Sequence, residues 1–267
     1  MIRDITIGQY YPADSILHRL DPRVKFIGTL IFLVSLFVSN KWEGYLLATA
    51  FLGAMILISK VPFGFMVKGL KPIFMILLIT VAFNLFLTPG TILVQFWIFK
   101  ITDAGCLQAG KMAIRLIYLI IGSSVMTLTT TPNQLTDGLE KLMRPLTRIK
   151  VPVHEIAMMM SIALRFIPIL MEETDKIMKA QIARGADFES GNLIKKAKAL
   201  IPLLVPLFIS AFRRANDLAM AMEARCYHGG EGRTQMKPLK YASRDLAAYG
   251  IMLLYLAGSI VIRILGR

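Results

Sequence analysis

Long runs without a single charged residue dominate this sequence and restrict its possible folds more than any other feature. Five such runs interrupt the chain of 267 residues: 26–40, 44–59, 72–99, 116–136 and 246–262. A helix that crosses a hydrocarbon core of about 30 Å needs about 20 mostly apolar residues. Because 55% of all residues are hydrophobic and only 18% are charged, we expect an all-α, polytopic membrane protein.

The runs predict about five transmembrane helices. We expect these spans at about 24–40, 43–59, 72–88, 106–128 and 246–263. The first run is short, but Lys41 at its end can extend its amine to the interface. Pro89 ends the third span, and the following run 92–99 is too short to cross again. Its aromatic residues, which include Trp97, are therefore expected at the membrane interface.

The distribution of positive charge predicts the orientation of these spans. No cleavable signal peptide is expected in 1–20, because no basic segment there precedes an apolar core. Segment 132–245 carries 18 Lys and Arg against 12 Asp and Glu, as expected for a segment retained in the cytoplasm. With the amino terminus also inside, the loops near Lys41 and Lys100 and the carboxyl terminus at Arg267 are expected outside.

Three segments follow from this topology. Residues 1–131 form a membrane domain with spans 1 to 4, residues 132–245 a cytoplasmic domain, and residues 246–267 the last transmembrane helix with an external tail. In the central segment, Thr131 and Gln134 predict a helix that begins at Pro132 and ends near Arg144. Two longer amphipathic helices are expected at about 152–184 and 192–225.

The ends of the two long helices resemble each other position by position. Each end has Ala, two further residues, Ala, Arg and a small residue, and its last three positions are Ala183-Arg184-Gly185 and Ala224-Arg225-Cys226. One interpretation is local, because Arg in a last turn complements the helix dipole and Gly caps the end. The repetition at matched helix ends favours a second interpretation, in which both ends dock into similar sockets on partner proteins.

Several motifs together resemble one known family. They are Gly8-Gln9-Tyr10, Ser15-Ile16-Leu17-His18, Leu20-Asp21-Pro22-Arg23, Pro152-Val153-His154-Glu155, Arg165-Phe166-Ile167-Pro168, Ala180 to Phe188, Ala221 to Tyr227 and Gly232-Arg233-Thr234. With them the sequence resembles, over nearly its whole length, the transmembrane T component of energy-coupling factor transporters. These transporters are ABC-type importers for vitamins and metal ions in bacteria and archaea.

The resemblance implies a function. In that family, each of two cytoplasmic coupling helices ends in an X-Arg-X motif that docks into a groove on one of two ATP-binding subunits. The corresponding residues here are Ala183, Arg184 and Gly185, and Ala224, Arg225 and Cys226, where Cys226 replaces the usual Gly. The chain would link ATP hydrolysis by these subunits to vitamin uptake through a membrane-embedded, substrate-binding S component, in the bacterial cytoplasmic membrane.

Two motif fragments suggest enzymes, but both are incomplete. The segment from Gly105 to Lys111 matches most of a phosphate-binding loop, yet Met112 replaces the Ser or Thr that would hold magnesium. We expect it to be an outer loop that enters the fourth span. His154-Glu155 begins like a zinc-protease helix, but Met158 stands where the second His is required. No catalytic, cofactor-binding or metal-ligating residue is therefore predicted, and ATP hydrolysis is assigned to partner subunits.

Other functions remain as alternatives. A net charge of +14 is compatible with nucleic-acid binding, but no stripe of alternating Arg and aromatic residues accompanies it, so no nucleic-acid partner is expected. The permease subunit of a conventional ABC transporter is the main alternative, followed by a membrane-embedded lipid-modifying enzyme. Arg115, inside the fourth span, either faces protein or extends to the outer surface.

Overall fold

The computed structural model describes residues 10–39, 41–96, 99–188, 192–230, 236 and 238–265. The chain divides into two compact units. The membrane unit is built on Gly8–Gly138 and Leu239–Arg267, and the long-helix unit on Leu139–Pro238. Each unit is described by itself below.

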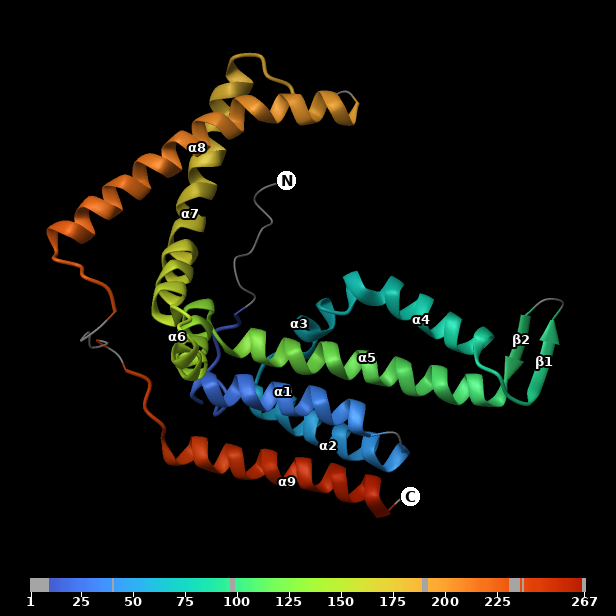
Figure 1. The fold of residues 1–267 in the computed structure, drawn as a ribbon. Helices are drawn as coiled ribbons and strands as arrows, with labels where there is room; N and C mark the ends of the chain where they lie inside the picture. The colour runs from blue at the N-terminus through green and yellow to red at the C-terminus, as the bar shows by residue number, and fades with distance from the viewer. Residues whose placement is uncertain are drawn as a thin grey trace. The chain divides into compact units, whose positions relative to one another are not determined.

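The membrane unit consists mainly of helices that follow the uncharged runs (Figure 1). They are α1 (Pro22–Val38), α2 (Trp42–Ser59), α3 (Phe63–Lys68), the short 3-10 helix η2 (Lys71–Ile73), α4 (Phe74–Leu87), α5 (Asp103–Thr129) and α9 (Ser243–Leu265). Helices α1, α2, α5 and α9 lie side by side and contact one another. Helix α4 packs against α5 and contains no buried residue. It therefore lies at the periphery of this unit.

Aromatic residues form the centre of the membrane unit. The rings of Phe51 on α2 and Tyr255 on α9 stack with their centroids 4.3 Å apart, and Phe32 on α1 lies beside both. The Tyr255 hydroxyl lies 2.7 Å from the hydroxyl of buried Ser35. A buried tyrosine usually needs such a partner for its polar end, so this hydrogen bond joins α1 to α9 within the apolar core.

A two-stranded hairpin corrects part of the sequence analysis. Strands β1 (Ile92–Phe96) and β2 (Phe99–Thr102) pair in antiparallel fashion, with Phe96 opposite Phe99. We predicted only an apolar segment at the interface here and no strands. The segment is rich in β-branched and aromatic residues, which favour strands, and it is too short for a span. Trp97 lies outside the described residues.

The start of α5 corrects a second expectation. The phosphate-loop-like segment from Gly105 to Lys111 is not a loop, because α5 begins at Asp103 and already includes it. The Thr102 hydroxyl accepts a hydrogen bond of 3.0 Å from the Gly105 N–H. Thr102 is thus the helix cap, and the glycines of this motif belong to the first turns of a regular helix.

Helix α6 (Pro132–Met143) confirms the helix start that was predicted at Pro132. The Thr131 hydroxyl accepts from the Gln134 N–H at 3.3 Å, and the Gln134 side chain accepts from the Thr131 N–H at 3.2 Å. These two reciprocal bonds form a capping box. The α-helix ends at Met143, as predicted, and continues as the 3-10 helix η3 (Arg144–Ile149).

The long-helix unit is built on α7 (Val153–Ala183) and α8 (Leu193–Ala224), which contact each other. Their bounds confirm the two predicted helices to within one residue. Pro168 lies inside α7, and Pro202 and Pro206 lie inside α8. Both helices continue through their prolines, and α8 changes direction along its length (Figure 1).

Six helices of the described chain are long and apolar enough to cross a membrane. Four of them lie at predicted spans: Trp42–Ser59, Phe63–Leu87, Asp103–Thr129 and Ser243–Leu265. The other two are Val153–Ala183 and Lys198–Ala224 in the long-helix unit, whereas α1 has only 17 residues. The chain is thus an all-α, polytopic membrane protein. Length and composition do not assign α7 and α8 to the cytoplasm, so that location and the segment boundaries stay predictions.

Candidate functional site

The six residues predicted to contact partners lie at the carboxyl ends of α7 and α8, the two long helices of the long-helix unit. Ala183 ends α7 and Ala224 ends α8, so Arg184 and Arg225 are the cap residues of the two helices. All six residues are exposed. Both guanidinium groups are therefore available to a partner.

The end of α7 is a Schellman cap. Gly185 has a left-handed backbone with a φ of +88°, which glycine adopts at no steric penalty. Its N–H donates to the Ile182 carbonyl at 2.9 Å. The N–H of Ala186 donates to the Gln181 carbonyl at 3.0 Å. These two bonds define the motif, and the predicted glycine cap is confirmed.

The end of α8 has the same geometry although no glycine is present. Cys226 has a φ of +55°, and its N–H donates to the Glu223 carbonyl at 2.8 Å. The N–H of Tyr227 donates to the Met222 carbonyl at 3.1 Å. The replacement of Gly by Cys therefore leaves the cap intact, and the two helix ends present their arginines from equivalent backbone positions.

An ion pair joins α7 to α8. Arg214 of α8 donates from Nη2 to Glu173 Oε2 at 2.5 Å, and both side chains are partly exposed. Glu173 lies about three helical turns before Arg184, and Arg214 lies equally far before Arg225. At 1.5 Å per residue, each exposed arginine lies about 16 Å along its helix from the pair. The two arginines thus lie equally far along their helices from the Glu173–Arg214 pair. A second contact, from Gln181 Nε2 of α7 to the Pro202 carbonyl of α8 at 3.3 Å, lies nearer the end of α7.

The sequence analysis missed this pair, although a signal was present. Glu173 and Arg214 are separated along the chain by the same number of positions as Arg184 and Arg225. A search for oppositely charged residues at this separation finds Glu173 and Arg214 together with other pairs such as Glu172–Arg213 and Lys176–Asp217. The signal therefore gives several candidate pairs, and only the packing of the helices selects one of them.

The second arginine also lines a groove within the long-helix unit. The groove has a volume of about 640 Å³ between the first half of α7 and the end of α8. Arg165, part of one family motif, lies in the same groove as Arg225. Its apolar lining consists of Met158, Ile162, Leu218 and Met222. A partner that approaches Arg225 therefore meets a second guanidinium and an apolar wall.

The family motif around Asp21 joins two helix starts of the membrane unit. Asp21 accepts from Arg23 Nε at 3.0 Å and from Arg23 Nη2 at 2.8 Å. Burial alone would raise the pKa of Asp21, but the hydrogen bonds from the Arg23 side chain and backbone outweigh this effect and lower it. The Asp21 N–H donates to Asp245 at 2.9 Å, and Asp245 also accepts from the Ala242 N–H. The starts of α1 and α9 therefore share one buried polar cluster.

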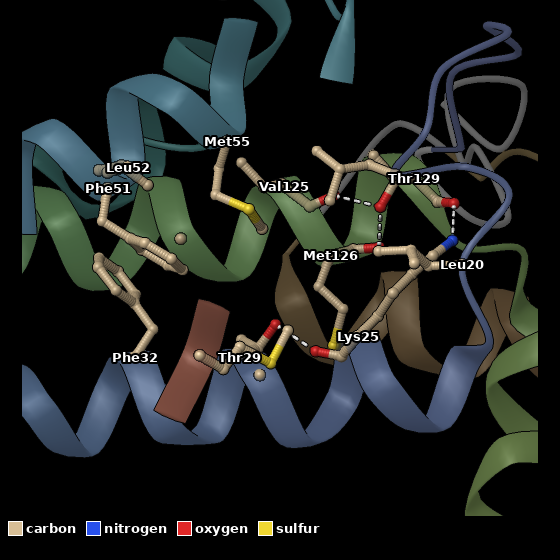
Figure 2. A pocket seen from close by; sticks show the side chains of 14 residues that line it. Leu20, Lys25, Thr29, Phe32, Phe51, Leu52, Met55, Val125, Met126 and Thr129 are labelled. Atoms are coloured by element: carbon tan, nitrogen blue, oxygen red, sulfur yellow. Dashed lines mark hydrogen bonds between the residues drawn. The ribbon is translucent and has the colours of Figure 1, made fainter. Parts of the chain in front are cut away.

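The Ser15–His18 motif holds the segment before α1 against the end of α5. Lys25 donates to the carbonyls of Thr129 at 2.8 Å and His18 at 3.2 Å, and Figure 2 shows the first bond at a cavity wall. The imidazole Nε2 lies 3.0 Å from the Tyr11 carbonyl. Because a carbonyl can only accept, Nε2 carries the proton and Nδ1 accepts from the Ser15 hydroxyl at 2.6 Å. Burial lowers the pKa of His18, which favours this neutral form.

Arg115 contacts protein at the end of α1 that the predicted topology places outside. Its Nη2 donates to the Ser39 carbonyl at 3.4 Å, at the carboxyl end of α1. The guanidinium carbon lies 5.5 Å from the Phe37 ring centre and 6.0 Å from that of Tyr45. A cation at a helix carboxyl end complements the helix dipole, so Arg115 stabilises the end of α1 inside the membrane unit.

The residues that gave the zinc-protease-like fragment lie at the junction of α6 and α7. His154 Nδ1 lies 3.0 Å from Glu140 Oε1, so this histidine has a hydrogen-bond partner on α6. Among the described residues, no group of three His, Cys, Asp or Glu could hold a metal ion. Gly8, Gln9, the Gly232-Arg233-Thr234 motif and Arg267 lie outside the described residues.

Comparisons with known proteins agree with the motifs. The family model described as cobalt transport protein, CbiQ, matches residues 13–236. An energy-coupling factor transporter transmembrane protein, EcfT, of Clostridium kluyveri is 59% identical over 266 residues, which cover 99% of this chain and 98% of the relative. The EcfT protein of Thermosediminibacter oceani is 54% identical and covers 98% and 99% of the two chains. That of Bacillus subtilis is 50% identical and covers 92% and 93%.

Proposed function

The chain belongs to the family of the cobalt transport protein CbiQ and of the EcfT transmembrane proteins, and from this premise we propose that it couples two ATPase subunits to vitamin uptake. It is the transmembrane component of an energy-coupling factor transporter and a multi-pass protein of the bacterial cell membrane. In this proposal the ATPases bind Arg184 and Arg225, and a separate S component in the membrane binds the vitamin. The names of the relatives favour this function over a conventional ABC permease or a lipid-modifying enzyme.

The matched helix ends are the observation that supports the proposal. Two exposed arginines occupy the same position of the same cap on two helices that contact each other. Two similar binding grooves on a pair of ATPase subunits require two similar helix ends. Small neighbours, Ala183 and Ala224, leave room for a partner to approach each arginine closely. If the arginines only stabilised their own helices, nothing would require this equivalence.

The crossing contact supports a mechanical role for the two helices. When the ATPases close on ATP, their sockets move toward each other and carry the bound helix ends with them. Because α7 and α8 are joined by the Glu173–Arg214 pair, the motion of one end is passed to the other helix. In this proposal the long-helix unit transmits the movement to the S component, and ATP hydrolysis occurs only in the partner subunits.

The test is copurification of the ATPases with arginine variants. Truncating an interface arginine typically costs about 2 kcal/mol or more, or roughly a 30-fold loss of affinity. Arg184→Ala and Arg225→Ala should each reduce the amount of bound ATPase, and the double variant should abolish both assembly and vitamin uptake. Arg213→Ala is the matched control, because Arg213 is an exposed arginine of α8 away from its end.

The local interpretation predicts a different result. Loss of a helix-dipole interaction costs about 0.3 to 1 kcal/mol per site and leaves assembly intact. Size-exclusion chromatography of the double variant shows whether the protein remains folded. A double variant with its full complement of ATPases and near-normal uptake would refute the coupling role of these arginines.

A further inference from the structure

An apolar groove opens on the membrane unit between α2, α9 and the segment that precedes α1. Its volume is about 250 Å³. The lining is Ile16, Leu17, Leu20, Phe51, Ala54, Met55, Ile58, Arg244, Ala247, Ala248, Ile251 and Met252. Small side chains at Ala54, Ala247 and Ala248 leave the space open. Arg244 is the single charged residue of this lining.

The groove follows the two helices inward from one membrane surface. Its α9 residues extend from Arg244 to Met252, about 12 Å at 1.5 Å per residue. Its α2 residues extend from Ile58 back to Phe51 over a similar length. Lys60 follows α2 directly, which places this end of α2 near the lipid headgroups. The groove therefore begins at headgroup level and ends among hydrocarbon.

A smaller cavity lies beside the groove in the same unit (Figure 2). That cavity has a volume of about 30 Å³ and shares with the groove Leu17, Leu20, Phe51, Met55 and Met252. Two of the shared side chains are methionines, whose flexible thioethers adapt to irregular apolar ligands. The groove itself is apolar apart from Arg244 and offers water few polar partners.

Arg244 is the cation at the mouth of the groove. It is exposed, and none of the ion pairs formed among the described residues includes it. Its neighbour Asp245 is not available as a partner, because that carboxylate accepts from the backbone N–H groups of Asp21 and Ala242. A guanidinium beside the headgroup region suits the phosphate of a lipid.

We propose that this groove binds one acyl chain of an anionic phospholipid whose phosphate contacts Arg244. The charge at the mouth favours a lipid over an apolar protein segment as the occupant. An exposed guanidinium beside an apolar groove matches the phosphate and one acyl chain of an anionic phospholipid. The proposal does not depend on the ATPase-coupling role.

The test measures phospholipid retained by the full chain after mild delipidation in detergent, by native mass spectrometry. Purified protein is incubated with phosphatidylglycerol or phosphatidylcholine of identical chains. Ala248→Phe, which fills the groove, should reduce retention of both lipids at least fivefold. Ala257→Phe is the matched control, because Ala257 is exposed on α9 and does not line the groove; its retention should equal that of the unmodified chain.

The arginine is tested separately with a mixture of both lipids. The unmodified chain should prefer phosphatidylglycerol roughly fivefold, as expected for one basic residue at an anionic surface. Arg244→Gln should abolish this preference but retain both lipids, whereas Arg263→Gln at the other end of α9 should keep it. Unchanged retention in Ala248→Phe would overturn the proposal. So would a loss of a protein partner from that variant without any loss of lipid.

Discussion

Cys226 has a backbone conformation that glycine adopts more easily than cysteine. It adopts a left-handed φ of +55°, which costs a residue with a Cβ roughly 1 kcal/mol or more relative to Gly. The Schellman bonds of the α8 end depend on this conformation. The chain therefore keeps the cap of α8 at some energetic cost, whereas the equivalent position of α7 is Gly185.

This difference predicts opposite effects of two substitutions. Cys226→Gly should stabilise the end of α8 by about 1 kcal/mol, and Gly185→Ala should destabilise the end of α7 by a similar amount. No atom lies within 4 Å of a Cβ added at Gly185, so the second effect contains no steric clash. Amide hydrogen exchange of the last turns would measure both. Equal exchange in all three proteins would show that the caps are not strained.

Asp21 predicts a pH dependence of the membrane unit. Its pKa is lowered in the folded protein, so its contribution to stability is fully present above the unfolded value of about 3.9. That contribution is lost as the pH falls from 4 through the folded pKa. Asp21→Asn should reduce stability at pH 7 by about 2 kcal/mol, since hydrogen bonds to a charged group are lost. The variant should also lose less thermal stability than the unmodified protein between pH 4 and 3. If the melting temperature fell equally steeply with pH in both proteins, this role of Asp21 would be contradicted.

At the scale of elements, the sequence predicted the helices well because their signals are local. Uncharged runs, the capping box at Thr131 and the glycine after Arg184 each depend on a few neighbouring residues. The hairpin at Ile92–Thr102 was missed because a short apolar run does not distinguish a strand from an interfacial segment. The Glu173–Arg214 contact and the Arg165 groove were missed because they depend on how two distant helices pack.

The crossing of α7 and α8 predicts a charge-swap experiment. Arg214→Glu alone should reduce vitamin uptake, because two carboxylates would face each other where Arg214 now meets Glu173. The double variant Glu173→Arg with Arg214→Glu should restore part of the uptake. ATPase copurification should remain in both variants, since the helix ends are unchanged.

The control for this experiment is the adjacent pair of exposed residues. Glu172→Arg with Arg213→Glu makes the same charge changes one residue away from the contact. These variants should transport normally in single and double form. If Glu173→Arg with Arg214→Glu recovered no uptake relative to Arg214→Glu alone, the pair would not join the two helices during transport.

At the scale of the whole molecule, the location of α7 and α8 distinguishes two topologies. Both helices meet the length and hydropathy expected of spans, so a model with two additional crossings would place the connection between them outside the cell. That connection and the start of α8 carry Arg184, Lys195, Lys196 and Lys198. Export of this basic segment contradicts the positive-inside rule, and an external Arg184 would be out of reach of cytoplasmic ATPases.

A single cysteine at Asn192 decides between these topologies. Asn192 is exposed, makes no side-chain cap hydrogen bond and lies at the start of α8. In a background with Cys106 and Cys226 replaced by Ser, Asn192→Cys should resist an impermeant thiol reagent on whole cells and react after the cells are opened. Lys41→Cys is the external control, because it lies outside in both topologies and should react in intact cells. Labelling of both sites from outside would place Arg184 on the wrong side of the membrane for ATPase binding, and the coupling function of the two helix ends would then be refuted together with the topology.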